Sequence, residues 1–158
     1  MPTDRHVLTD GERRFIDERR HAVLATTAPD GRARLVPICY ALTDEVDRVG
    51  RPILYTPIDD KKKKTDNPHD VARVRDLLVL PELSLIIDRW DEDWDQLAWL
   101  RIYGYGELLE PQPDEIAEHA AAVTLLRARY PQYAAHDLEH RPIIRVAIER
   151  VVSWGSFE

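Results

Sequence analysis

Hydrophobic and polar residues along this chain alternate in short segments that are typical of β-strands. The segments are rich in valine, isoleucine, leucine and tyrosine, and most of them end near glycine, proline or aspartate. One segment, 83–88, is almost continuously apolar, so we expect that strand to be buried. The pattern predicts about six strands, at residues 21–27, 32–42, 52–57, 83–88, 97–109 and 143–153.

Two or three helices are predicted between these strands. Thr9 and Glu12 form a capping-box pattern, which predicts a first helix over residues 10–20. Apolar residues recur at helical spacing over 71–78, before Pro81. They recur again before Pro131, where we expect one helix face to pack on the sheet. That face consists of Ile116, Ala120, Val123, Leu126 and Tyr130.

The connections favour antiparallel pairing. Pro29, Asp30 and Gly31 supply a turn between the first two strands, and residues 43–51 form a polar link to the third. Gly104, within a long strand, suggests a bulge or a close backbone approach. Short connections between successive strands predict a closed or split antiparallel barrel with helices at its ends.

Composition limits the class of protein. The 158 residues suit one domain, 1–158, and the apolar stretches are too short to cross a bilayer. The first nine residues lack a signal-peptide core, and Cys39, the single cysteine, reads as a small strand residue that has no disulfide partner. We therefore expect a cytoplasmic protein without a membrane span. A net charge of −7 and a pI near 5.4 argue against nucleic-acid binding.

Four consecutive lysines at 61–64 oppose this acidic balance and follow a predicted strand. A lysine run is most often a solvated loop, but at a strand end it can also neutralise a phosphate or a chain of carboxylates. Arg32 and Arg34 lie two positions apart in a predicted strand, so they should face the same side and converge on one anion. These residues make an anion site the leading hypothesis.

Other chemistry finds little support. Asp91, Asp93 and Asp95 imitate the start of a calcium loop, but the glycine and the closing glutamate of that loop are missing. His136 and His140 lie four apart without a zinc-protease motif, so they read as a surface pair. No nucleophile elbow and no glycine-rich phosphate loop occurs. The sequence therefore predicts neither a metal site nor hydrolysis.

The order of the elements resembles a known family. The likeness rests on residues 22–27, 30–38, 53–56, the lysine run, 83–88 and 103–108, and it covers nearly the whole chain. These segments resemble the pyridoxamine 5'-phosphate oxidase-like split β-barrel family. The resemblance implies an α+β or mainly β fold, namely an antiparallel split barrel of the FMN-binding type with two to three flanking helices.

One stretch, 88–101, is similar to an actinobacterial branch of flavin/deazaflavin oxidoreductases that use coenzyme F420. That resemblance implies an oxidoreductase that transfers a hydride from reduced F420 to an organic acceptor, and a homodimer with the cofactor between its subunits. The other motifs are shared with FMN enzymes and with haem-binding relatives. An FMN-dependent oxidoreductase and a non-catalytic cofactor or haem-binding protein therefore stay open as alternatives.

The resemblance also implies where the cofactor lies. Its phosphate would lie near the second strand, the end of the third strand and the lysine run, while its ring would lie on the segment 36–38. The polyglutamate tail of F420 suits a lysine-rich groove better than the single phosphate of FMN does. No catalytic residue is assigned, because the reactive atom belongs to the cofactor. The implied cofactor-binding residues are Arg32, Arg34, Val36, Pro37, Ile38, Tyr55, Thr56, Lys61, Lys63, Lys64, Trp99 and Trp154.

Overall fold

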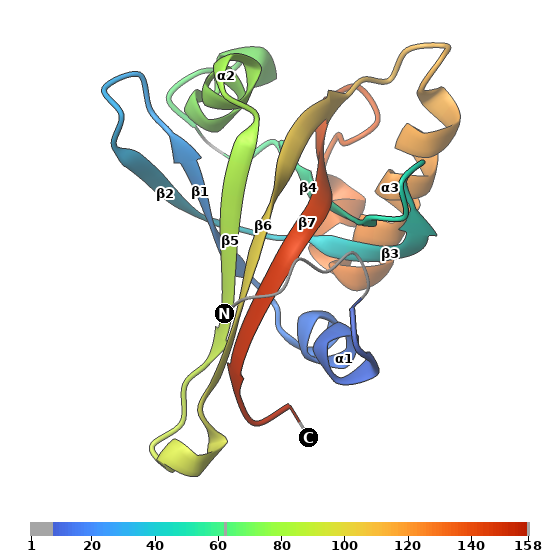
Figure 1. The fold of residues 1–158 in the computed structure, drawn as a ribbon. Helices are drawn as coiled ribbons and strands as arrows, with labels where there is room; N and C mark the ends of the chain where they lie inside the picture. The colour runs from blue at the N-terminus through green and yellow to red at the C-terminus, as the bar shows by residue number, and fades with distance from the viewer. Residues whose placement is uncertain (1–7, 62, 158) are drawn as a thin grey trace.

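The computed structural model describes residues 8–61 and 63–157, and over these ranges it contains seven antiparallel strands and three α-helices (Figure 1). The helices are α1 (Asp10–Glu18), α2 (Ala72–Val79) and α3 (Ile116–Arg129), with short 3₁₀ helices η1 (Pro68–Asp70), η2 (Trp94–Gln96) and η3 (Pro131–Ala135). The strands are β1 (Ala22–Thr27), β2 (Ala33–Ile38), β3 (Ala41–Val46), β4 (Pro52–Pro57), β5 (Glu82–Arg89), β6 (Ala98–Leu109) and β7 (Ile143–Gly155).

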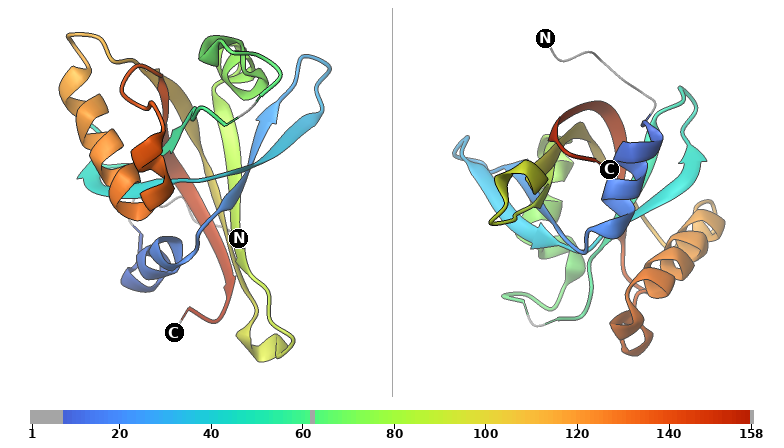
Figure 2. Two further views of the ribbon diagram at one scale, coloured as in Figure 1. Left: turned by 180° about the vertical axis from the view of Figure 1, so that it is seen from behind. Right: turned by 90° about the horizontal axis from the view of Figure 1, so that it is seen from below.

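All seven strands form one sheet in the order β2-β1-β5-β6-β7-β4-β3. The two edge strands, β2 and β3, are consecutive in sequence and are separated only by Cys39 and Tyr40. The chain therefore passes directly from one edge of the sheet to the other, which requires the sheet to curl until its edges approach (Figure 2). The sheet is not closed, which confirms the predicted antiparallel split barrel.

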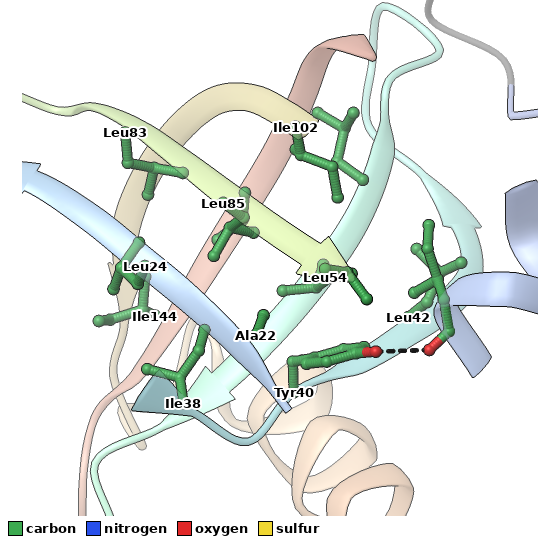
Figure 3. Packing of buried hydrophobic residues seen from close by; sticks show 14 of the residues in the cluster. Ala22, Leu24, Ile38, Tyr40, Leu42, Leu54, Leu83, Leu85, Ile102 and Ile144 are labelled. Atoms are coloured by element: carbon green, nitrogen blue, oxygen red, sulfur yellow. Dashed lines mark hydrogen bonds between the residues drawn. The ribbon is translucent and has the colours of Figure 1, made fainter. Parts of the chain in front are cut away.

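The prediction of one strand over 32–42 is wrong. The chain bends at Tyr40, whose side chain is fully buried and whose hydroxyl donates a 2.6 Å hydrogen bond to the carbonyl of Ile16 (Figure 3). The backbone N–H of Tyr40 donates to the hydroxyl of Tyr130. This second bond satisfies a backbone N–H that a continuous β-ladder would otherwise satisfy. The first residues of the polar link predicted over 43–51 belong to β3. The break at Tyr40 divides the predicted strand into β2 and β3, so the sheet has seven strands rather than six.

Apolar side chains from β1, β4, β5 and β6 fill the inside of the curled sheet (Figure 3). The predicted burial of the segment 83–88 holds for one face only, because burial alternates along β5 and Ile86 is 37% exposed. Gly104 lies at a register shift between β6 and β7, and a Cβ there would come within 2.3 Å of the carbonyl oxygen of Ala147. This close approach confirms the role predicted for that glycine.

The helices lie where the sequence predicts them, but their buried faces match the prediction only in part. Thr9 and Glu12 form the predicted capping box at the start of α1. In α3, Ile116 and Ala120 are exposed, contrary to the prediction. The face that packs on the sheet includes His119 instead, because its imidazole Nε2 lies 2.7 Å from the carbonyl oxygen of Arg141 and is therefore satisfied when buried. Within the described residues, no helix is long and apolar enough to cross a membrane.

Candidate functional site

A pocket of about 230 Å³ lies where the end of β2, the end of β4, the lysine loop, the start of α2 and η3 meet. The elements bring together residues that are far apart in the sequence. Its wall combines apolar, cationic and acidic side chains, so it can hold an anion against an apolar surface. The lining residues are Val36, Pro37, Ile38, Cys39, Thr56, Pro57, Asp59, Lys61, Lys63, Arg73 and Tyr133.

Asp59 organises the cations of this pocket. Its carboxylate accepts hydrogen bonds from Lys61 Nζ at 2.7 Å and from Lys63 Nζ at 2.9 Å, and also from the hydroxyl of Tyr133 at 3.0 Å. Burial by itself would raise the pKa of Asp59, but the hydrogen bonds and charges of the two lysines outweigh it and hold that pKa well below its ordinary value. Asp59 is therefore an internal counter-ion that fixes both ammonium groups.

The two lysines differ in how many N–H protons remain available for a ligand. Lys63 Nζ donates to the carboxylate and the carbonyl of Asp59 and to the carbonyl of Lys61, which uses all three of its protons. Lys61 Nζ donates one hydrogen bond to Asp59, and its side chain is 62% exposed. Lys61 therefore has protons available for an incoming anion, whereas Lys63 contributes mainly its charge.

Arg73 and Thr56 each place a buried polar atom in this pocket. The hydroxyl of Thr56 and the Nε of Arg73 are buried and have no hydrogen-bond partner among the described residues. Burial lowers the pKa of Arg73, and the charges of Asp59 and Tyr133 only partly offset this effect. A buried donor without an acceptor costs about 1–3 kcal/mol, so these two groups call for a ligand with anionic oxygens.

Arg73 was not among the residues predicted for the site. Its position two residues into the helix that follows the lysine loop was the only available signal. Together Lys61, Lys63 and Arg73 place three positive charges around the single carboxylate of Asp59. The pocket therefore carries an excess of positive charge that can bind a phosphate or a similar anion.

Several predicted residues do lie in this pocket. They come from the second strand, the fourth strand and the lysine loop, and each lies near the end of its element. They are Val36, Pro37, Ile38, Thr56, Lys61 and Lys63.

Arg32 and Arg34 lie elsewhere. Arg34 Nε donates to Asp76 Oδ2 at 2.7 Å and lines a different cavity of about 460 Å³. Arg32 precedes β2 rather than belonging to it, so strand alternation does not align it with Arg34. Its side chain is exposed and lies 3.9 Å from Asp30. The two guanidinium groups thus face different carboxylates.

The remaining predicted residues are also outside the pocket. Tyr55 neighbours Thr56 in β4 and so points to the opposite face, where its hydroxyl donates to Glu118 at 2.8 Å. Trp99 and Trp154 are register partners on β6 and β7. Lys64 is exposed, and Lys62 of the lysine run lies outside the described residues.

Comparison with known families agrees with the fold. The profile of the pyridoxamine 5'-phosphate oxidase family matches residues 8–155. The chain belongs to the pyridoxamine 5'-phosphate oxidase family. Among proteins with curated functions, no significant match exists.

Solved structures of this family's fold carry varied names. The conserved hypothetical protein Rv2991 from Mycobacterium tuberculosis has 23% identity and a TM-score of 0.68, covering 94% of this chain and 86% of that chain. An F420 reductase has 19% identity and a TM-score of 0.62, covering 92% and 98%. The haem storage protein HutZ from Vibrio cholerae has 15% identity and a TM-score of 0.60, covering 90% and 89%. At these identities the likeness is one of fold.

Proposed function

We propose that this member of the pyridoxamine 5'-phosphate oxidase family binds coenzyme F420 and transfers a hydride from its reduced form to an organic acceptor. The observation that carries the proposal is a pair of buried polar atoms beside the lysine loop, Arg73 Nε and Thr56 Oγ1, which have no hydrogen-bond partner in the described part of the chain. A phosphate oxygen at that position would accept from both groups. The residues present therefore fit a phosphate-bearing cofactor.

The lysine loop supports F420 over FMN. Arg73, Thr56 and Lys61 are enough to hold one phosphate, which is all that FMN offers. Lys64 adds a further exposed cation that has no hydrogen bond or ion pair with other described residues. A polyglutamate tail supplies carboxylates for such a cation, and one structure with the same fold is named an F420 reductase.

The apolar part of the pocket would receive the cofactor ring. Val36 and Ile38 lie on the inner face of β2, and Pro37 is exposed on this edge strand, where it offers no N–H. When bound, the deazaflavin would supply the hydride. The protein residues would anchor the phosphate and tail, orient the ring on β2 and exclude water from one side of it.

A fluorescence titration tests the cofactor. We expect the purified protein to bind F420 more tightly than FMN, and Arg73→Ala to weaken F420 binding about 10- to 100-fold, the scale of one lost charge-assisted hydrogen bond. Arg48→Ala, which removes an exposed cation from the β3–β4 turn, is the control and should bind as the wild type does. Tighter binding of FMN would make the F420 assignment wrong.

A second candidate is a haem-binding protein without turnover, favoured by the shared fold of HutZ. Reduced F420 carrying deuterium at C5 separates the two functions when it is mixed with candidate acceptors such as quinones or biliverdin. Deuterium in the product supports hydride transfer. Tight haem binding without any turnover would support the carrier instead.

A further inference from the structure

Asp59 is the only carboxylate among the described residues that line the pocket of Arg73 and Thr56, and it is 6% exposed. Its side chain accepts a hydrogen bond from the backbone N–H of Lys61 at 3.2 Å. It also accepts from the Nζ atoms of Lys61 and Lys63 and from the hydroxyl of Tyr133. These bonds come from the backbone, the lysine loop and η3, so they hold the carboxylate inside the pocket when an anion enters.

The carboxylate also keeps its negative charge. Because the two lysines hold the pKa of Asp59 well below its ordinary value, the group is ionised both at pH 5 and at pH 8. Protonation therefore does not remove its charge when an anion binds in that range. Any phosphate in this pocket meets three cations and one fixed anion.

The small size of the pocket makes this anion matter to a ligand. A phosphate bound by Arg73 Nε, Thr56 Oγ1 and Lys61 Nζ would share a cavity of about 230 Å³ with the carboxylate of Asp59. Such a cavity leaves little room for water between the two groups. The repulsion between them is therefore screened much less than it would be at the surface.

Phosphate esters differ in the charge that they bring into the pocket. A monoester, such as that of FMN, carries two negative charges above its second pKa of about 6, whereas a diester, such as that of F420, carries one. Each cation of the pocket attracts the doubly charged ester about twice as strongly, and Asp59 repels it about twice as strongly. Asp59 therefore reduces the advantage that a doubly charged ligand would otherwise have.

We propose that Asp59 determines the specificity of this pocket, by disfavouring the second negative charge of a phosphomonoester and so shifting the preference of the pocket toward phosphodiesters. Asp59 acts on the ligand through its charge and needs no contact with it. The inference rests on the proposed function only for the position of the phosphate. It names the charge of the phosphate as a feature by which the pocket distinguishes F420 from FMN.

Two small esters test this role by isothermal titration calorimetry of the cofactor-free protein in a buffer without phosphate. Phenyl phosphate is a monoester, and methyl phenyl phosphate is a diester with the same ring. At pH 8 we expect Asp59→Asn to raise the ratio of monoester affinity to diester affinity about tenfold, the scale of one charge–charge interaction in a partly buried site. Asp66→Asn removes an exposed carboxylate near the lysine run and should leave the ratio unchanged. Equal ratios in Asp59→Asn and the wild type would overturn the proposal.

Repeating the titrations at pH 5 separates charge from shape. The monoester then carries one negative charge, as the diester does, so Asp59→Asn should no longer change the ratio. The other charged and titratable groups around Asp59 are present in both proteins, so changes in their protonation cancel in this comparison. These groups are Cys39, Lys61, Lys63, Arg73, Tyr133 and Arg141. A rise in the ratio that persists at pH 5 would overturn the charge mechanism.

Lys63 supplies a charge-compensated variant, because its Nζ is bound to Asp59. Lys63→Gln should lower the ratio at pH 8 about tenfold, and Lys63→Gln/Asp59→Asn should return it to the wild-type value, since the pair then loses one charge of each sign. This pair of variants tests the same substitution even if Asp59→Asn alone does not fold. Equal ratios in Lys63→Gln and the double variant would contradict the role of Asp59.

Arg73→Ala distinguishes a failure of this inference from a failure of the proposed function. We expect it to weaken the binding of both esters, because it removes the buried donor that lies in the same pocket as Thr56. If both esters bind through Arg73 while Asp59→Asn leaves their ratio unchanged, the inference is wrong and the phosphate site stands. If neither ester binds to the wild type, the phosphate site itself is wrong, and the proposed function loses its basis as well.

Discussion

Arg34 and Asp76 form an ion pair with 2.7 Å between Nε and Oδ2, and this pair ties the edge strand β2 to helix α2. The hydroxyl of Thr26 donates to the same oxygen at 2.8 Å. The Asp76 side chain is only 3% exposed, whereas that of Arg34 is 39% exposed. The carboxylate therefore depends on Arg34 for its counter-ion, and the pair positions α2, which carries Arg73, over the pocket.

Replacing Arg34 with Ala should lower the free energy of unfolding by about 1–3 kcal/mol, because it leaves the carboxylate of Asp76 buried without a counter-ion. Urea denaturation measures the change. Arg32→Ala is the matched control: its side chain is 88% exposed, so the loss there should stay within about 0.5 kcal/mol. Equal stabilities of the two variants would contradict a structural role for the Arg34–Asp76 pair.

Asp59 should make the free energy of unfolding depend on pH in the acidic range. Burial alone would raise its pKa, but Lys61 and Lys63 lower it overall, so folding favours the ionised carboxylate. The resulting stabilisation is complete above the unfolded-state pKa, about 4, and is lost as the pH falls from there toward the lower folded-state pKa.

The measurement compares wild type with Asp59→Asn. We expect the difference between their free energies of unfolding to be largest near pH 6 and to shrink as the pH is lowered toward 2. Urea titrations at each pH provide these values. A difference that stays constant over this range would show that the lysines do not lower the pKa of Asp59.

Alanine substitutions at two glycines should change the stability of the protein in opposite directions. At Gly104 a Cβ would lie 2.3 Å from the backbone oxygen of Ala147, so Gly104→Ala must displace a strand and should cost roughly 2 kcal/mol or more. At Gly11, in α1, the nearest atom to a Cβ is 3.6 Å away in Phe157. Gly11→Ala should therefore stabilise the protein by about 0.5–1 kcal/mol through its helix propensity. Thermal denaturation ranks the two variants, and a stable Gly104→Ala protein would argue against the bulge.

Local patterns predicted most of the elements of this family member. The capping box of Thr9 and Glu12 starts α1 where expected, and Gly104 marks the irregular point of the longest strand pairing. These features depend on residues close in sequence or on a backbone that tolerates no side chain. The break at Tyr40 has no such signal, since neither glycine nor proline stands there. It arises because Tyr40 is buried against Ile16 and Tyr130, which lie 24 and 90 residues away.

The same division applies to the candidate site. The sequence by itself determined a basic loop at the end of a strand and, through its resemblance, the segments that line the pocket. Only the tertiary structure decided that Arg34 binds Asp76, 42 residues away, and that Arg73 lines the same pocket as Thr56, with no partner for its Nε among the residues that the structure describes. Whether a charged group is paired or free for a ligand depends on which distant groups surround it when it is buried, and that is settled by the packing of the whole chain.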